Sequence, residues 1–152
     1  VKLQGGAIVW DKVNDGADQS GAEIAYNSLN ERVDVVRYMW RGMMQGDGIG
    51  SMRQQGNKAL NERRIHPTQK PVKLYEWLLQ QYARPGMRIL DTHLGSGSIA
   101  IAAHYYGVDF VGCEIDADYW RAANERFEAK PRKRALLPPN AKSKPPAVGG
   151  SA

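Results

Sequence analysis

The stretch Asp91-Thr92-His93-Leu94-Gly95-Ser96-Gly97-Ser98 decides the fold, because it joins a short apolar run to an apolar helical pattern. Residues 87–90 are typical of a buried strand, and residues 99–103 are typical of a helix. Glycines between a strand and a helix let the backbone approach a ligand, and the free N–H groups at the helix start favour a polar or anionic group. The sequence therefore predicts an α/β fold with a nucleotide-type cofactor loop at residues 91–98.

A second strand and helix follow this loop. With a helix at residues 98–106, a strand at 110–114 and a helix at 119–128, the pattern predicts a strand-helix-strand-helix unit with a parallel strand pair. Asp91 ends the first strand and Glu114 ends the second, so both carboxylates should reach the sheet edge where ligands of open α/β sheets bind. One carboxylate can hold an amino group of a cofactor, and the other can hold ribose hydroxyls.

The residues before this unit predict a mixture of strands and one helix. A strand is expected near residues 7–10, and alternating patterns predict two more at 23–27 and 33–40. Pro71 begins a helix, because apolar side chains follow it at helical spacing. Residues 42–64 are rich in Gly, Met and Gln and have no helix or strand periodicity, so they are predicted to form a loop.

With His66-Pro67-Thr68-Gln69-Lys70-Pro71 placed before the helix, this order of pieces resembles the DNA N6-adenine/N4-cytosine methyltransferases that use S-adenosylmethionine. Residues 91–98 resemble that family's glycine loop, D-P-F-x-G-S-G-T. Thr92, His93 and Ser98 stand where Pro, Phe and Thr are commoner. The resemblance implies a partial Rossmann-like methyltransferase fold, in which part of the mixed, mostly parallel sheet is missing.

The resemblance also implies which residues hold the cofactor. The residue matching Asp91 contacts the methionine end of S-adenosylmethionine, and the one matching Glu114 contacts the ribose, with Ile115 beside the adenine ring. Lys70 would supply the counter-charge to the methionine carboxylate. Asp116 is instead expected to be an acidic residue at a helix N-terminus. The cofactor residues implied in this way are Thr68, Gln69, Lys70, Asp91, Thr92, His93, Gly95, Ser96, Gly97, Ser98, Glu114 and Ile115.

Two alternatives compete with this interpretation. Residues 95–100 also satisfy the dinucleotide fingerprint G-x-G-x-x-[GA]. In dinucleotide folds the first glycine follows the strand almost at once, whereas three residues separate Asp91 from Gly95 here. A carboxylate aimed at a pyrophosphate is also unfavourable, so both observations favour S-adenosylmethionine over NAD. The second alternative is that residues 66–71 form only a rigid turn that caps the following helix.

The family's catalytic motif is Asp, Asn or Ser followed by two prolines and an aromatic residue, and the chain contains no such motif. Its Pro-Pro pairs at 138–139 and 145–146 are followed by Asn140 and Ala147. The chain begins at Val1. We therefore expect no catalytic residue in this chain and place the motif upstream, in a longer enzyme. The alternative is a non-catalytic remnant that binds S-adenosylmethionine or DNA.

Positive charge is concentrated near the C-terminus. The net charge is +5, and residues 130–152 hold six basic side chains and no acidic one. Because this stretch also carries five prolines, it cannot bury a core. We expect a disordered tail that either solubilises the chain or contacts phosphates without sequence preference.

A second basic region lies within residues 41–70, where six basic residues face only Asp47 and Glu62. It contains the loop at 42–64, whose glycines make ordering costly. We expect a target-recognition loop that orders only on double-stranded DNA, with a plain surface loop as the alternative. The residues predicted to contact phosphates or guanine edges are Arg53, Lys58, Arg63 and Arg64.

The chain is therefore predicted to contain a partial methyltransferase domain at residues 1–129 and the tail at 130–152. The domain's three parts are catalytic-region strands at 1–41, the target-recognition loop at 42–64 and a cofactor-binding unit at 65–129. In the first part, Ile8-Val9-Trp10-Asp11-Lys12 and Ala22-Glu23-Ile24-Ala25-Tyr26 resemble strands of the family's catalytic region.

Other residues predict ordinary structural roles. Cys113 is the single cysteine and is expected to be a buried core thiol, and with no visible signal peptide it fits a reducing cytoplasm. No stretch approaches the roughly 20 apolar residues of a membrane helix. No Cys or carboxylate stands at zinc spacing from His66 or His93, so no metal site is predicted. The aromatic residues expected in the helix core are Trp77, Tyr119 and Trp120.

Overall fold

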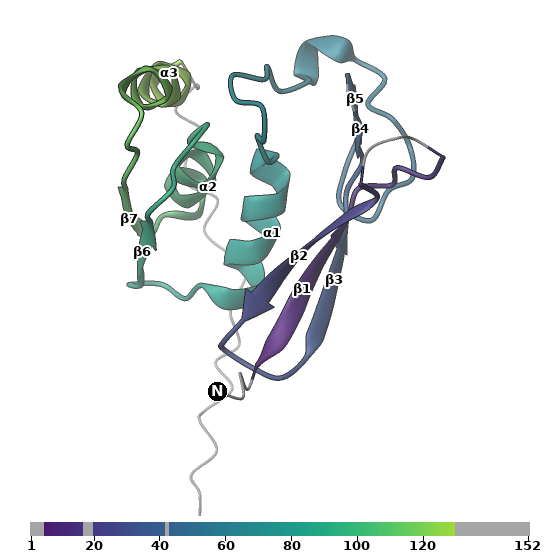
Figure 1. The fold of residues 1–152 in the computed structure, drawn as a ribbon, viewed down its shortest axis with the longest axis horizontal. Coiled ribbons are helices and arrows are strands. Elements are labelled where there is room, and N and C mark those ends of the chain that lie inside the picture. Colours follow the sequence, from purple (N-terminus) through teal and green to yellow (C-terminus); the bar gives the residue numbers. More distant parts are fainter. Residues whose placement is uncertain (1–4, 17–19, 42, 130–152) are drawn as a thin grey trace, which may run out of the picture.

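The computed structural model describes residues 5–16, 20–41 and 43–129, and the predicted tail lies outside the described residues. This part of the chain contains three small β-sheets and three α-helices (Figure 1). Helix α1, Val72–Tyr82, lies between a three-stranded sheet and a strand-helix-strand-helix unit.

The three-stranded sheet has the order β2-β1-β3. Strand β1, Gly6–Asp11, pairs antiparallel with β2, Ala22–Asn27, and parallel with β3, Val33–Arg37. The strand predicted at residues 33–40 is divided in two, because β3 ends at Arg37 and a short strand β4, Trp40–Arg41, begins a second sheet. The expected strands near residues 7–10 and 23–27 are confirmed.

One face of this sheet packs on α1, as the alternation of apolar residues predicts. The buried cluster on this face consists of Trp10, Val36, Tyr38, Trp40 and Leu74. Trp10 also donates its indole N–H to the Tyr38 carbonyl at 3.1 Å, so its polar atom is satisfied inside the cluster. On the opposite face, apolar side chains of β2 and β3 such as Ile24 and Val35 are exposed.

The other side of α1 packs on helix α2, Ser98–Tyr106. Val72 and Leu79 of α1 meet Ile101, Ala102 and Ala103 of α2, and all five side chains are buried. Small alanine side chains let the two helix backbones approach closely. This contact connects the three-stranded sheet, through α1, to the unit that carries the glycine loop.

The strand-helix-strand-helix unit forms as predicted. Strand β6, Arg88–Asp91, pairs in parallel with β7, Asp109–Gly112, and α2 connects them. Helix α3, Ala117–Glu128, follows and begins two residues earlier than expected. Apolar residues of β6 and β7 alternate, so Ile89 and Phe110 pack under α2 whereas Leu90 and Val111 are exposed on the other face.

Residues 43–64 contain more structure than the sequence predicts. Strand β5, Met44–Gln45, forms a hairpin with β4, so the boundary expected between residues 41 and 42 falls inside a hairpin. A 3-10 turn, η1, covers Lys58–Leu60. The Gln45 side chain donates to the Glu62 carbonyl at 2.8 Å and accepts from the Glu62 N–H at 2.7 Å. These paired bonds link β5 to the residues that precede α1. The expectation that the segment orders only on DNA stays a prediction.

Two burial predictions are wrong. Cys113 is exposed, because it follows the last residue of β7 at the open edge of the sheet. Trp120 is 50% exposed, because α3 packs against α2 and the glycine loop through a narrow face whose buried apolar residue is Ala123. Trp77, by contrast, is partly buried against the core of the three-stranded sheet, as expected.

Candidate cofactor site at the carboxyl edge of β6 and β7

The glycine loop lies on the carboxyl edge of the parallel pair. Asp91 and Gly112 are the last paired residues of β6 and β7. Backbone hydrogen bonds join the two segments that follow them. The Cys113 N–H donates to the Asp91 carbonyl at 2.8 Å, and the Leu94 N–H donates to the Cys113 carbonyl at 2.9 Å. The loop is therefore fixed at both ends, at the position where ligands of open α/β sheets bind.

Two glycines give the loop its shape. Gly95 has a φ of +52° and Gly97 has a φ of +69°, a conformation that side-chain-bearing residues adopt only with strain. Gly97 also precedes the first residue of α2 and lies against α3, since a Cβ placed on it would be 3.2 Å from the Ala123 Cβ. The two glycines therefore allow a compact turn between β6 and the start of α2, packed against α3.

Glu114 closes the loop from the neighbouring strand. Its Oε2 accepts the Gly95 N–H at 2.7 Å, and its Oε1 accepts the Asp116 N–H at 3.1 Å. The Asp116 and Gly95 N–H groups donate to Glu114 and lower its pKa below its usual value, so this carboxylate is ionised at neutral pH. Ile115 is fully exposed beside it. Asp116 caps α3 by accepting two backbone N–H bonds, which confirms its expected role.

Asp91 lies at the same edge in a half-buried position. Its Oδ1 accepts the His93 N–H at 2.9 Å, which orients the carboxylate above the strand end. The Thr92 and His93 side chains are exposed and contact each other, with 2.9 Å between Thr92 Oγ1 and His93 Nδ1. The structure therefore brings Asp91 and Glu114 to the same edge, on either side of the loop.

The segment at residues 66–70 passes beside the loop. The His66 ring lies 4.3 Å from the Tyr119 ring, measured between centroids, and next to Gly95. Thr68 is exposed, and its N–H and hydroxyl both contact His66 Nδ1. Gln69 is buried within the turn, where its side chain accepts from the Ile65 N–H and donates to the Arg63 carbonyl. Gln69 therefore holds the turn and does not project from the edge.

Lys70 is held by a residue that the sequence did not suggest. Lys70 Nζ lies 3.2 Å from Glu23 Oε2, and Lys12 Nζ lies 2.7 Å from Glu23 Oε1. Partial burial alone would raise the pKa of Glu23, but the two lysines outweigh it and lower the pKa. Glu23 is on β2, so this cluster joins the three-stranded sheet to the cofactor unit.

Burial raises the pKa of Tyr75 to about 12, and the charges of Asp91 and Glu23 add to the effect. Tyr75 therefore keeps its hydroxyl proton and stays neutral beside the two acids. The Tyr75 hydroxyl is therefore an uncharged group close enough to Asp91 and Glu23 to feel their charges.

The two loop serines are buried and have structural roles. Ser98 Oγ donates to the Lys70 carbonyl at 2.7 Å, and 3.1 Å separates Ser96 Oγ from Ser98 Oγ. These contacts join the glycine loop to the segment before α1. Ser96 and Ser98 thus shape the loop from below, whereas Asp91, Glu114 and Ile115 present their side chains at its edge.

A buried ion pair below the loop was also missed. Arg126 Nη2 lies 2.6 Å from Glu62 Oε2, and the same guanidinium contacts Ser96 and Ser98. Two signals could have found it. Arg126 follows the buried Ala123 by three residues, on the face of α3 that packs inward, and Glu62 is one of only two acids in the basic region.

The predicted DNA-contacting residues are all exposed. Arg53 lies 3.4 Å from Asp47, and Arg64 stacks over the Trp40 ring at 4.8 Å from its centroid. Lys58 is in η1, and Arg63 follows Glu62 directly. In Figure 1 this segment occupies the upper part of the molecule around β4 and β5.

Within the described residues, no cluster of three or more His, Cys, Asp or Glu side chains could hold a metal ion. None of the helices in that part of the chain is long and apolar enough to cross a membrane.

Comparison with solved structures identifies the fold as that of the methyltransferases. The chain superposes on the M1.HpyAVI-SAM complex with a TM-score of 0.53 at 21% identity, covering 80% of this chain and 60% of that chain. This confirms the expected partial Rossmann-like methyltransferase fold. The N6_N4_Mtase family model, described as DNA methylase, matches residues 8–125, and the chain belongs to this family.

Curated relatives agree with this assignment. The type II methyltransferase M2.DpnII of Streptococcus pneumoniae is 37% identical over 124 residues, which are 81% of this chain and 42% of that protein. The putative methylase YubD of Escherichia coli is 38% identical over 45% of this chain and 30% of its own length. The type II methyltransferase M1.MboII of Moraxella bovis is 39% identical over 39% of this chain and 23% of its own length. The chain thus spans less than half the length of these relatives.

Proposed function

We propose that this chain is the cofactor-binding part of a DNA methyltransferase that transfers a methyl group from S-adenosylmethionine to the exocyclic amine of adenine (N6) or cytosine (N4). The observation that carries the proposal is the pair of carboxylates, Asp91 and Glu114, on either side of a glycine loop at one sheet edge. Membership of the DNA methylase family supports the reaction class.

The site's charge favours S-adenosylmethionine over a dinucleotide. The Gly95 N–H, which would face a phosphate in a dinucleotide site, donates instead to the Glu114 carboxylate. A pyrophosphate here would meet this negative charge, whereas a ribose can donate its hydroxyls to it. We assign the ribose to Glu114, the cofactor's amino group to Asp91 and the adenine ring to the exposed Ile115.

Lys70 is the proposed counter-charge to the methionine carboxylate. Lys70 Nζ is paired with Glu23, and Lys12 shares the same carboxylate. Because Glu23 is already paired with Lys12, Lys70 can turn toward an incoming carboxylate without leaving Glu23 without a partner. The cluster thus keeps a cation available at the methionine end.

Methyl transfer requires a further part of the enzyme. When bound, S-adenosylmethionine would supply an electrophilic methyl group on its sulfonium for the exocyclic amine of a base flipped out of the duplex. The family's Pro-Pro-aromatic motif would orient the amine, and this sequence lacks it. The chain's coverage of 42% of M2.DpnII supports the proposal that the motif lies elsewhere in a longer protein.

Amide chemical shifts of an isotope-labelled chain, followed during titration with S-adenosylmethionine, test the proposed location. The largest changes are expected at Gly95, Ser96, Gly97 and Ile115, because these amides surround the loop. Residues of β1 and β3 should be unaffected. Saturable shifts confined to another surface would contradict the assignment, and absence of binding would reject it.

Residues 43–64 are the proposed DNA-contacting surface. Its candidate side chains are Arg53, Lys58, Arg63 and Arg64, which are exposed on one segment, and the Gln45–Glu62 bonds link β5 to the end of that segment. Arginine at such positions can contact phosphates or read guanine edges.

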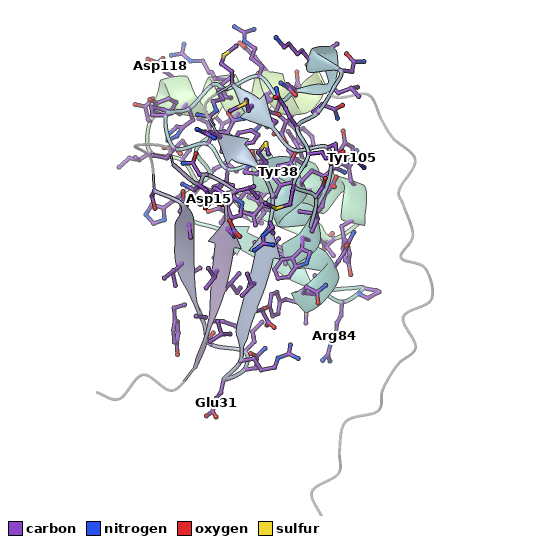
Figure 2. The ribbon with its side chains drawn as sticks, turned by 90° about the vertical axis from the view of Figure 1, so that its right-hand side faces the viewer. Asp15, Glu31, Tyr38, Arg84, Tyr105 and Asp118 are labelled. Carbon is purple, nitrogen blue, oxygen red and sulfur yellow. The ribbon has the colours of Figure 1, made fainter. Side chains whose placement is uncertain are left out.

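Replacing Arg63 and Arg64 together with alanine, in a methyltransferase that contains this chain, should weaken DNA binding. The salt dependence should flatten by roughly one unit of slope for each lost phosphate contact, while cofactor affinity should not change. Filter binding across a salt series, with labelled DNA and separately with labelled cofactor, measures the two affinities. The matched control replaces Arg84 and Arg88, of which Arg84 lies at the lower end in Figure 2, far from this segment. If DNA binding has the same salt slope in the altered and unaltered enzymes, residues 43–64 do not contact DNA and only connect the neighbouring elements.

A further inference from the structure

The buried ion pair between Arg126 and Glu62 differs from the other ion pairs of the described residues in its burial. Their side chains are 8% and 12% exposed, and Arg126 Nη2 lies 2.6 Å from Glu62 Oε2. Arginine and glutamate are rarely buried, because removing two charges from water is costly. A buried pair of this kind is weak evidence for stability alone, so its contacts must indicate its role.

The contacts of Arg126 converge on the glycine loop. Its Nη1 donates to the Ser96 carbonyl at 2.7 Å and to Ser98 Oγ at 2.9 Å. Ser98 Oγ in turn donates to the Lys70 carbonyl at 2.7 Å. One guanidinium on α3 therefore fixes both the backbone of the loop and the hydroxyl that joins the loop to Lys70.

The contacts of Glu62 connect the same guanidinium to the proposed DNA-contacting segment. Glu62 Oε1 accepts the Val72 N–H at 2.8 Å, at the start of α1, where no side chain of the helix's own N-cap is available. The Glu62 backbone is held by Gln45 of β5. Through Glu62, Arg126 thus connects the loop to the start of α1 and to residues 43–64.

We propose that Arg126 and Glu62 are positioning residues for the cofactor loop: their buried pair holds the Ser96 carbonyl and Ser98 hydroxyl in the binding conformation and couples residues 43–64 to that loop. The proposal rests on the proposed function for the identity of the cofactor. Neither residue is assigned a contact with S-adenosylmethionine, because both lie below the loop.

Three variants of the chain test this proposal. Arg126→Met combined with Glu62→Met removes both charges, so no unpaired charge remains buried. Arg126→Lys keeps the charge but loses the fork that reaches Ser96, Ser98 and Glu62 at once. The matched control is Arg121→Met, which removes an exposed arginine of the same helix that pairs with Asp118.

Amide hydrogen exchange without cofactor is the first measurement. In the double variant and in Arg126→Lys, exchange at Gly97 and Ser98 should accelerate by about tenfold or more, the effect of losing a hydrogen bond to a charged group. Exchange in β1 and β3 should not change. Arg121→Met should match the unaltered chain at every site. The proposal would be overturned if amide exchange at Gly97 and Ser98 is unchanged in both test variants. It would also be overturned if exchange accelerates equally throughout the chain.

Calorimetric titration with S-adenosylmethionine is the second measurement. The dissociation constant should rise by about tenfold in the double variant and remain unchanged in Arg121→Met. Affinity that is retained while the loop exchanges faster would overturn the positioning role. If the unaltered chain binds no S-adenosylmethionine, the proposed function fails, and the exchange experiment alone still decides whether the pair holds the loop.

Discussion

Replacing Asp91 with alanine is expected to weaken binding of S-adenosylmethionine by about 1 to 3 kcal/mol, roughly 5- to 150-fold in the dissociation constant. Asp91 is the carboxylate assigned to the cofactor's amino group, and the His93 N–H orients it at the strand end. Removing it loses a charged hydrogen-bond partner in a half-buried place, where water compensates poorly. Titration calorimetry of the folded variant measures the effect.

Asp109→Ala is the matched control for Asp91. Asp109 begins β7, at the opposite end of the same parallel pair, and lies 3.8 Å from Arg88 with both side chains exposed. An exposed pair of this kind contributes little to stability. Its replacement should leave cofactor affinity unchanged. Equal affinity of the Asp91→Ala and Asp109→Ala chains would remove Asp91 from the site.

The second large effect expected is a lack of methyl transfer by this chain alone. The 152-residue chain by itself should transfer no methyl group to DNA, because its sequence lacks the Asp/Asn/Ser-Pro-Pro-aromatic motif that would orient the target amine. Binding of the cofactor should nevertheless persist. Incubation with methyl-labelled S-adenosylmethionine and mixed-sequence DNA, followed by counting label in the DNA, measures this. Label above the no-protein background would mean that catalytic residues within this chain have been overlooked.

The cofactor unit could be predicted from sequence because its signals are local. The apolar strands next to the glycine loop, the helix after it and the helical spacing after Pro71 each arise from neighbouring residues. Strands β6 and β7 and helices α2 and α1 confirm these elements. The edge location of Asp91 and Glu114 follows from parallel pairing alone.

The supporting contacts could not be predicted in this way, because each joins residues far apart in the chain. Glu23 of β2 reaches Lys70 in the segment before α1, and Arg126 reaches Glu62 across 64 positions. The position of Arg126 near Ala123 and the scarcity of acids around Glu62 mark each residue singly, but no local spacing pairs the two, or pairs Glu23 with Lys70.

Burial at the edges was the other source of error. Cys113 and Trp120 lie in apolar or helical contexts that usually mean core, but each side chain emerges where the described elements leave an open surface. In residues 43–64, hydrogen bonds between Gln45 and Glu62 link distant parts of a segment whose composition predicts a loop. Composition reports the cost of ordering such a segment but not the contacts that offset it.

Titration of the unaltered chain with S-adenosylmethionine and, separately, with NAD tests the central claim most directly. The two carboxylates and the Gly95–Glu114 hydrogen bond predict saturable, one-to-one binding of S-adenosylmethionine and no binding of NAD at the same concentrations. Preference for NAD, or no heat of binding with S-adenosylmethionine from a folded chain, would contradict the account.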